Sequence, residues 1–176
     1  MVLASRKMQQ YAFQNNPDLK AHAQTAQQSA SEGIVLLKNE KALPLQNKSN
    51  VALFGVTSYD FIAGGTGSGD VNEAYTVSLG EGLKNKGFEI NKVIQKSFDT
   101  HKAANAKAFV KPEGGRAMFI KYNPPQWIPS SEEMTQSVGS ADIGIITIGR
   151  NSGEGAEKKE KDDFLLTSME QKLIEQ

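Results

Sequence analysis

The chain has 176 residues, of which 38% are hydrophobic, and its 20 basic side chains balance its 20 acidic ones. This length suffices for one domain with a buried core, alone or with an extension. The charge balance does not indicate nucleic-acid binding. Because the chain has no cysteine, disulfides, a thiol nucleophile and a thiolate metal site are excluded. No run reaches the ~20 apolar residues of a membrane-spanning helix, and His22 and His101 lack ligand-like spacing, so we predict no membrane span, metal or cofactor.

The first predicted helix follows a polar segment, residues 1–16, which is typical of a connector. Asn16 fits the N-cap of this helix and Pro17 fits its first position. From Leu19 onward, apolar residues recur every three or four positions and draw one stripe along a helix. A glycine weakens the helical prediction near the end, so in an alternative interpretation residues 34–37 begin a strand.

A strand, a helix and a second strand are predicted next. Val51–Gly55 is a short apolar run ended by glycine, which is typical of a buried strand. Residues 76–87 are amphipathic and end in Gly87, a helix stop signal. Phe88–Ile90 alternates like a brief strand, which in a longer interpretation extends to Ile94. This order predicts a parallel sheet with a right-handed crossover.

A glycine-rich loop, AGGTGSGD at residues 63–70, lies between the first strand and that helix. A Walker A loop needs a lysine after its last glycine, where this chain has Asp70. A dinucleotide fingerprint places its glycines directly at the end of the strand, whereas these come about nine residues later. An acidic residue in the loop would also repel phosphate. Nucleotide binding and a surface loop without a ligand are both kept as interpretations.

The next segment, up to residue 130, carries weaker signals. A helix is predicted near Thr100–Ala108, which is rich in alanine and lysine. Trp127, the only tryptophan, either stacks on a sugar ring or packs over the core. Ser130 and Glu133 fit a capping box, in which each side chain bonds the backbone N–H of the other, and so predict a helix start.

The last strand is predicted at residues 142–149, an apolar run interpreted as a central strand buried on both faces. The loop that follows, RNSGEG, places Glu154 between two glycines at the carboxyl end of this strand. Ligands of open α/β sheets collect at that end, and a carboxylate held there is a candidate general acid/base. The alternative is a solvated carboxylate in a glycine turn. Thr167 is then predicted to cap a final helix.

Three stretches of the chain together resemble glycoside hydrolase family 3, the β-glucosidase and β-xylosidase family. They are SASEGIVLLKNEKALPL, GGTGSGD, and SGEG followed by a charged pair and Asp163-Phe164, in the family's order. The resemblance implies an α/β fold, a three-layer sandwich with a mostly parallel sheet that is incomplete in this fragment. It also implies that residues 1–16 are a linker from a missing N-terminal (β/α)8 barrel, and that residues 17–176 are part of the C-terminal sandwich domain.

The resemblance further implies that the parent is a retaining β-glycosidase of the β-glucosidase type. Glu154 corresponds to the family's catalytic acid/base, while the nucleophile, an aspartate of the barrel, has no counterpart in this chain. Family members often carry an aspartate-arginine pair after SGEG, where this chain has Glu157-Lys158, and this change puts the hydrogen bonding of the loop in question. The implied substrate-binding residues on the two loops are Gly65, Thr66, Gly67, Ser68 and Ser152.

The expected partners are therefore a β-linked glucoside or related oligosaccharide and the barrel of the same protein. The fragment by itself is expected to hydrolyse nothing, because it lacks the nucleophile. A periplasmic or secreted parent is compatible with the resemblance, which leaves the compartment open. Two other classes are kept as alternatives: a small-ligand or nucleotide-binding α/β module that uses residues 65–69, and a purely structural domain.

Overall fold

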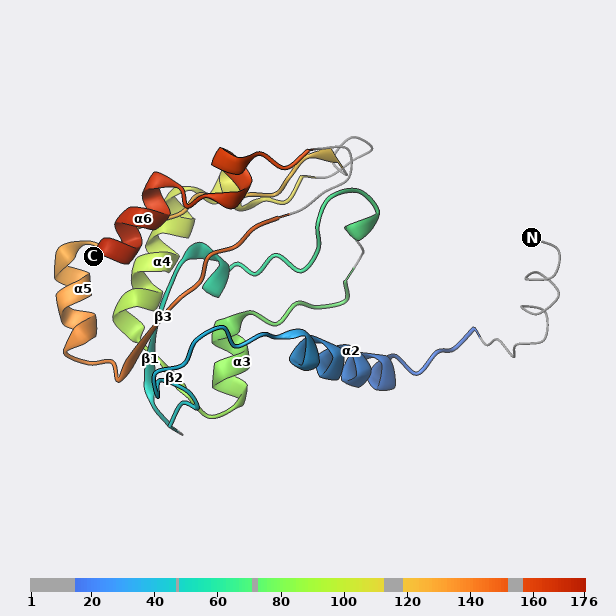
Figure 1. The fold of residues 1–176 in the computed structure, drawn as a ribbon, viewed down its shortest axis with the longest axis horizontal. Coiled ribbons are helices and arrows are strands. Elements are labelled where there is room, and N and C mark those ends of the chain that lie inside the picture. Colours follow the sequence, from blue (N-terminus) through green and yellow to red (C-terminus); the bar gives the residue numbers. More distant parts are fainter. Residues whose placement is uncertain (1–14, 47, 71–72, 113–118, 152–156) are drawn as a thin grey trace. The chain divides into compact units, whose positions relative to one another are not determined.

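Figure 1 shows the computed structural model of the chain, which describes residues 15–46, 48–70, 73–112, 119–151 and 157–176. The chain divides into two compact units, Met1–Pro44 and Leu45–Gln176. The first unit contains α2, and the second contains the sheet with the helices that cover it. The prediction that a linker precedes residue 17 stays a prediction.

In the first unit, α2 (Leu19–Gly33) has no buried residue. Its N-cap is Asp18, whose carboxylate accepts a hydrogen bond from the backbone N–H of Ala21 at 3.0 Å. The prediction of Asn16 as the cap was wrong by two residues, because an aspartate closer to the helix satisfies the free N–H group.

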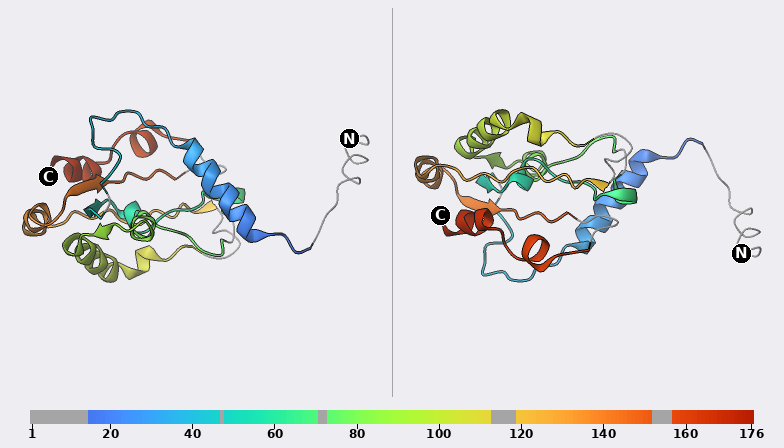
Figure 2. Two further views of the ribbon diagram at one scale, coloured as in Figure 1. Left: turned by 90° about the horizontal axis from the view of Figure 1, so that it is seen from below. Right: turned by 90° about the horizontal axis from the view of Figure 1, so that it is seen from above.

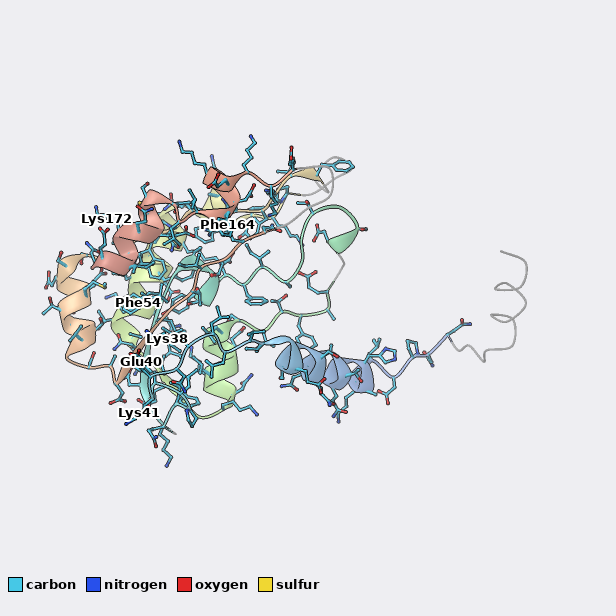
Figure 3. All side chains as sticks on the ribbon, in the orientation of Figure 1. Lys38, Glu40, Lys41, Phe54, Phe164 and Lys172 are labelled. Atoms are coloured by element: carbon cyan, nitrogen blue, oxygen red, sulfur yellow. The ribbon has the colours of Figure 1, made fainter. Side chains whose placement is uncertain are left out.

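Residues 34–37 follow α2 without regular secondary structure, and their four apolar side chains are exposed within this unit. The backbone at Ile34 is extended, but the part of the chain that the structure describes contains no strand here. The strand interpretation of this segment is therefore not confirmed. Just beyond it, Lys38 pairs with Glu40 at 2.9 Å; both residues are labelled in Figure 3.

In the second unit, a parallel sheet is built from β1 (Asn50–Phe54), β2 (Glu89–Ile90) and β3 (Ile143–Ile146), in the order β2-β1-β3. Val51 pairs with Ile90 on one side of β1 and with Ile143 on the other. The predicted parallel sheet is confirmed. The central strand, however, is β1 and not the last strand as predicted.

Helices cover both faces of the sheet, so the unit has three layers (Figures 1 and 2). Because successive side chains of a strand point to opposite faces, Val51 and Leu53 contact the side of α3 (Leu79–Asn85), whereas Ala52 and Phe54 contact the other side. That second side is covered by α4 (Lys92–Ala104), α5 (Ser131–Val138) and α6 (Ser168–Glu175). The expected α/β sandwich is confirmed, with Phe54 inside it (Figure 3).

Local sequence signals set most helix ends. Ser130 and Glu133 form the predicted capping box of α5, and Thr167 caps α6 as predicted. Gly87, with φ of +86°, follows α3 as the predicted stop. Short helical turns among the described residues include η1 (Val56–Ser58), η2 (Gly67–Gly69), η3 (Ala106–Phe109) and the π-helical turn η5 (Glu160–Phe164).

Two expectations about α4 were wrong. This helix begins at Lys92, so β2 does not extend to Ile94, and it ends at Ala104, before the predicted Ala108. The early start follows from Asn91, whose buried side-chain oxygen accepts hydrogen bonds from two backbone N–H groups, those of Val93 and Ile94. Such a cap starts a helix where the alternating pattern alone indicated a strand.

Trp127 lies in the core and not on a sugar platform. Its side chain is 4% exposed, its ring centroid is 5.2 Å from that of Phe98 in α4, and its indole N–H donates to Ser97 Oγ at 3.2 Å. A buried ring with a satisfied N–H packs well, and it has no face left for a ligand. Of the two roles considered for Trp127, packing is the one that the structure shows.

The prediction that the last strand is buried on both faces was also wrong. In β3, Ile143 and Ile145 are half-buried on the α3 side, whereas Gly144 and Ile146 are exposed, Ile146 to 43%. The reason is the position of β3 at the edge of the sheet, where Gly144 and Ile146 are more exposed than Ala52 and Phe54, the residues of β1 that they pair with. An apolar run does not distinguish an edge strand from a central one.

The chain just beyond the carboxyl end of β1 passes very close to the chain beyond β3 at Gly55. This residue has φ of +88°, and a Cβ built on it would lie 2.1 Å from the carbonyl oxygen of Thr147. The hydroxyl of Thr147 bonds the hydroxyls of Thr57 at 2.8 Å and Ser58 at 2.9 Å. Only glycine allows the two strand ends to be this close.

We expect Gly55→Ala to destabilise the chain more than Gly87→Ala. Both residues have a positive φ, so each substitution costs ~1–3 kcal/mol of backbone strain. At Gly87 a Cβ meets nothing within 4 Å, whereas at Gly55 the clash adds ~1–3 kcal/mol. Urea unfolding of both variants measures the difference, and equal losses would contradict the close approach.

Candidate functional site

A pocket of about 300 Å³ lies at the carboxyl edge of the sheet, beyond the ends of β1 and β3. The strand order reverses here, because the chain leaves β1 for β2 on one side while β3 lies on the other. Ligands of open α/β sheets bind in crevices at such points. The polar side chains around the pocket include those of Thr57, Lys121, Asn123, Gln126, Arg150, Asn151, Asp163 and Glu170.

The carboxylate of Glu170 in α6 holds the guanidinium of Arg150, four residues beyond β3. The two nitrogens Nη1 and Nη2 donate to Oε1 and Oε2 at 2.6 and 2.9 Å. Glu170 is only 8% exposed and also accepts from the backbone N–H of Thr167 at 2.8 Å. Burial alone would raise the pKa of Glu170, but the hydrogen bonds from Arg150 and Thr167 outweigh it and hold that pKa below its ordinary value.

A second ion pair joins Asp163 to Lys121, 42 residues apart in the sequence. Lys121 Nζ donates to Asp163 Oδ1 at 2.8 Å, and the backbone N–H of Lys159 donates to Oδ2 at 2.9 Å. Lys158 Nζ lies 3.7 Å from Oδ1. The hydrogen bond from Lys121, followed by that from Lys159, lowers the pKa of Asp163 to about 2. Asp163 is therefore ionised at neutral pH.

A chain of hydrogen bonds connects the loop after β3 to α4. Asn151 Nδ2 donates to the backbone oxygen of Tyr122 at 3.3 Å, and the hydroxyl of Tyr122 donates to Asp60 Oδ2 at 2.5 Å. Lys102 of α4 donates to Asp60 Oδ1 at 2.7 Å. Burial, and then the hydrogen bond to Asp60, raise the pKa of Tyr122 above its ordinary value. These hydrogen bonds hold the start of the loop after β3, at Asn151, in place.

The predicted site residues fall into two groups. Glu154 and Ser152 lie outside the described residues. Gly65, Thr66, Gly67 and Ser68 lie on a loop that extends from the same edge of the sheet as the chain beyond β3 (Figures 1 and 2). None of these four is among the described residues that line the pocket.

Within that loop the two hydroxyl side chains differ in accessibility. Thr66 is 6% exposed, whereas Ser68 is exposed. Asp70, at the end of the loop, forms an ion pair with Lys111. A carboxylate in this position disfavours phosphate, so the loop gives no support to the nucleotide-binding alternative.

Sequence reasoning missed the ion pairs that surround the pocket. A local signal existed for Glu170, since Thr167 and Glu170 have the spacing of a capping box. No local signal connects Glu170 to Arg150 or Lys121 to Asp163, because their separations of 20 and 42 residues come only from the fold.

The fold and this edge define a three-layer α/β domain with a candidate ligand site at the switch point of a parallel sheet. Residues 34–176 match the family described as glycosyl hydrolase family 3 C-terminal domain. The chain belongs to this family, as its three motifs had indicated.

Relatives with known names support this assignment. The chain is 34% identical to beta-glucosidase A of Butyrivibrio fibrisolvens over 142 residues, which are 78% of this chain and 16% of that protein. It is 28% identical to a beta-glucosidase of Ruminococcus albus over 160 residues, 89% of this chain and 16% of that protein. The chain thus spans about a sixth of the length of these relatives.

Solved structures agree with the relatives. Beta-glucosidase 3B from Thermotoga neapolitana, in complex with alpha-D-glucose, matches with a TM-score of 0.80 and 38% identity, over 96% of this chain and 23% of that one. A beta-glucosidase from Paenibacillus barengoltzii matches with a TM-score of 0.74 and 30% identity, over 86% of this chain and 16% of that one. These similarities favour the glycosidase interpretation over the nucleotide-binding and purely structural alternatives.

Two further properties concern only the residues that the structure describes. Their helices are too short or too polar to cross a membrane. Their His, Asp and Glu side chains form no group of three or more that could hold a metal ion.

We expect the stabilising effect of Asp163 to disappear in acid. Its pKa of about 2 lies below the ordinary value of 3.8, so the contribution to stability is complete above about pH 4 and falls as the pH approaches about 2. Asp163→Asn removes this contribution. The difference in free energy of unfolding between the native chain and this variant, measured in urea, should be constant from about pH 7 to 5 and should shrink below about pH 4. A difference that persists at about pH 2 would contradict the ion pair.

Proposed function

We propose that this chain is part of a retaining β-glycosidase of the β-glucosidase type, in which Glu154 is the general acid/base. The observation that carries the proposal is the family match over residues 34–176, within which the SGEG motif follows β3 in the sequence. The named relatives are beta-glucosidases, which supports a β-linked glucoside or related oligosaccharide as substrate.

The proposed reaction uses two carboxyl groups ~5–5.5 Å apart, on opposite sides of the glycosidic bond. In the first step, the nucleophile on an N-terminal barrel attacks the anomeric carbon, and Glu154 gives its proton to the departing oxygen. In the second step, Glu154 takes a proton from water, which attacks the same carbon and releases the sugar and the nucleophile. This chain supplies Glu154, and the barrel supplies the nucleophile.

Glu154 must be protonated before the first step. In a closed site, burial and the nearby nucleophile would raise its pKa toward the working pH. The domain therefore depends on its partner both for the nucleophile and for the state of its own acid.

The glycine-rich loop and the SGEG loop are proposed to bind the sugar. Ser68 is the better candidate for direct contact with a sugar hydroxyl, because it is exposed, whereas Thr66 is buried. Gly65 and Gly67 would allow close approach of the backbone, and Ser152 would contribute from the second loop.

The test of the acid/base is Glu154→Ala in the full-length protein. Its kcat should collapse on an aryl glucoside with a poor leaving group and fall less on one with an activated leaving group, which needs no protonation. Azide should restore turnover of the activated substrate, because this anion attacks the glycosyl-enzyme in place of water and needs no general base. An equal loss of kcat on both substrates, without rescue by azide, would mean that Glu154 has only a structural role. An unchanged kcat would mean that another residue is the acid.

We also expect the purified 176-residue chain to hydrolyse no aryl β-glucoside, because the nucleophile is proposed to lie on the barrel. The assay is release of the aryl alcohol at high protein concentration, with the Glu154→Ala chain as control. Turnover by the native chain that the variant lacks would show that the chain contains both catalytic carboxyl groups.

A further inference from the structure

An ion pair holds the end of the glycine-rich loop, residues 63–70. Lys111 Nζ pairs with Oδ1 of Asp70, the last residue of that loop, and lies 3.9 Å from Glu73 Oε1. The side chain of Asp70 is 26% exposed and that of Lys111 is 45% exposed. The hydrogen bond with Asp70 raises the pKa of Lys111, so this side chain stays charged at neutral pH. The loop is therefore tied to a distant segment, the one that follows η3.

The same aspartate closes the turn that carries Ser68. The backbone N–H of Asp70 donates to the carbonyl oxygen of Gly67 at 3.1 Å, across η2. The other limb of the loop lies directly against it, because a Cβ built on Gly64 would be 2.6 Å from the carbonyl oxygen of Gly69 and 3.6 Å from Asp70 Cα. A displacement of Asp70 would therefore displace the turn and its serine.

The composition of the loop makes this restraint important. Four of the seven residues 64–70 are glycines, and glycine has the widest range of backbone conformations. Such a segment keeps a single shape only where contacts offset the entropy of ordering it. Thr66 is buried in the loop, whereas Ser68 is exposed. The position of the exposed hydroxyl group thus depends on the turn that Asp70 closes.

We infer that Lys111 is a positioning residue for the sugar site, acting through Asp70 on the turn that carries Ser68. This inference rests on the proposed function, in which the glycine-rich loop binds the sugar. It goes beyond that proposal, because it gives a role in substrate affinity to a lysine outside all three family motifs. Neither Lys111 nor Asp70 touches the substrate in this scheme.

The variants separate the ion pair from the fold. Lys111→Met removes the charge and keeps a long side chain, and Lys111→Arg keeps the charge. Because an ion pair of partly exposed side chains contributes little to stability, both variants should fold. The matched control is Lys107→Met in η3, which removes an exposed lysine that belongs to none of the ion pairs among the described residues. Asp70→Asn, alone and combined with Lys111→Met, tests the other partner.

The first measurement is KM and kcat of the full-length variants on an aryl glucoside. Lys111→Met should raise KM about 3- to 10-fold, the loss of one hydrogen bond to the sugar. Its kcat should stay within about twofold, because a displaced Ser68 binds substrate and transition state more weakly alike. Lys111→Arg should restore most of the affinity, and Lys107→Met should behave as the native protein. The double variant should be no worse than either single one, since both remove the same contact.

The second measurement needs no substrate. Hydrogen–deuterium exchange of peptides that cover residues 63–70 should be faster in Lys111→Met than in the native protein, because the turn closed by Asp70 opens more often. Lys107→Met should leave this exchange unchanged. Unchanged exchange in Lys111→Met would mean that the ion pair does not hold the loop, and would overturn the inference.

Ser68→Ala, assayed in parallel, distinguishes the inference from the proposed function. If Ser68→Ala leaves KM unchanged, the proposed sugar-binding role of the loop fails, and the inference fails with it. If Ser68→Ala raises KM while Lys111→Met and Asp70→Asn do not, only the positioning role fails. A fall in kcat in proportion to the folded fraction, measured by thermal unfolding, with KM unchanged, would mean that Lys111 has only a structural role.

Discussion

The candidate site depends on the parallel pairing of β1 with β3. This pairing sets Phe54 opposite Ile146, so the chain leaves both strands at the same edge and forms a pocket between the two exits. The exits are so close that a Cβ on Gly149 would lie 2.5 Å from Thr57 Cγ2, and one on Gly55 would meet Thr147. Gly55 and Gly149 therefore allow the two chain segments to lie as close together as the pairing of β1 with β3 requires.

Charged groups around this pocket are paired rather than left open to solvent. Arg150 pairs with Glu170 and Lys121 with Asp163, and both carboxylates have lowered pKa values because cationic and N–H donors surround them. The cost of desolvation offsets part of the attraction within such partly buried ion pairs. Their clearer effect is orientation, and in the proposed mechanism, which divides the two carboxyl groups between two domains, each of these groups must be held in place.

Short-range patterns determined much of the fold in advance. The capping box at Ser130 and the stop at Gly87 depend on residues three or four positions apart, so they are legible in the sequence. The apolar run of β1 and the order of strand and helix predicted the parallel sheet for the same reason. The three motifs identified the family, because each is a contiguous run of residues that can be recognised without the fold, and one of them contains Glu154, the proposed acid/base.

The tertiary structure decided what depends on residues far apart. It placed the last strand at the edge, where Ile146 is exposed, since an apolar run has the same pattern in either place. It also showed that Trp127 packs in the core, whereas the sequence left open whether this side chain packs there or stacks on a sugar ring. The partners of Arg150 and Asp163 come from a later helix and a distant loop, because packing of the layers and not sequence spacing sets which charges meet.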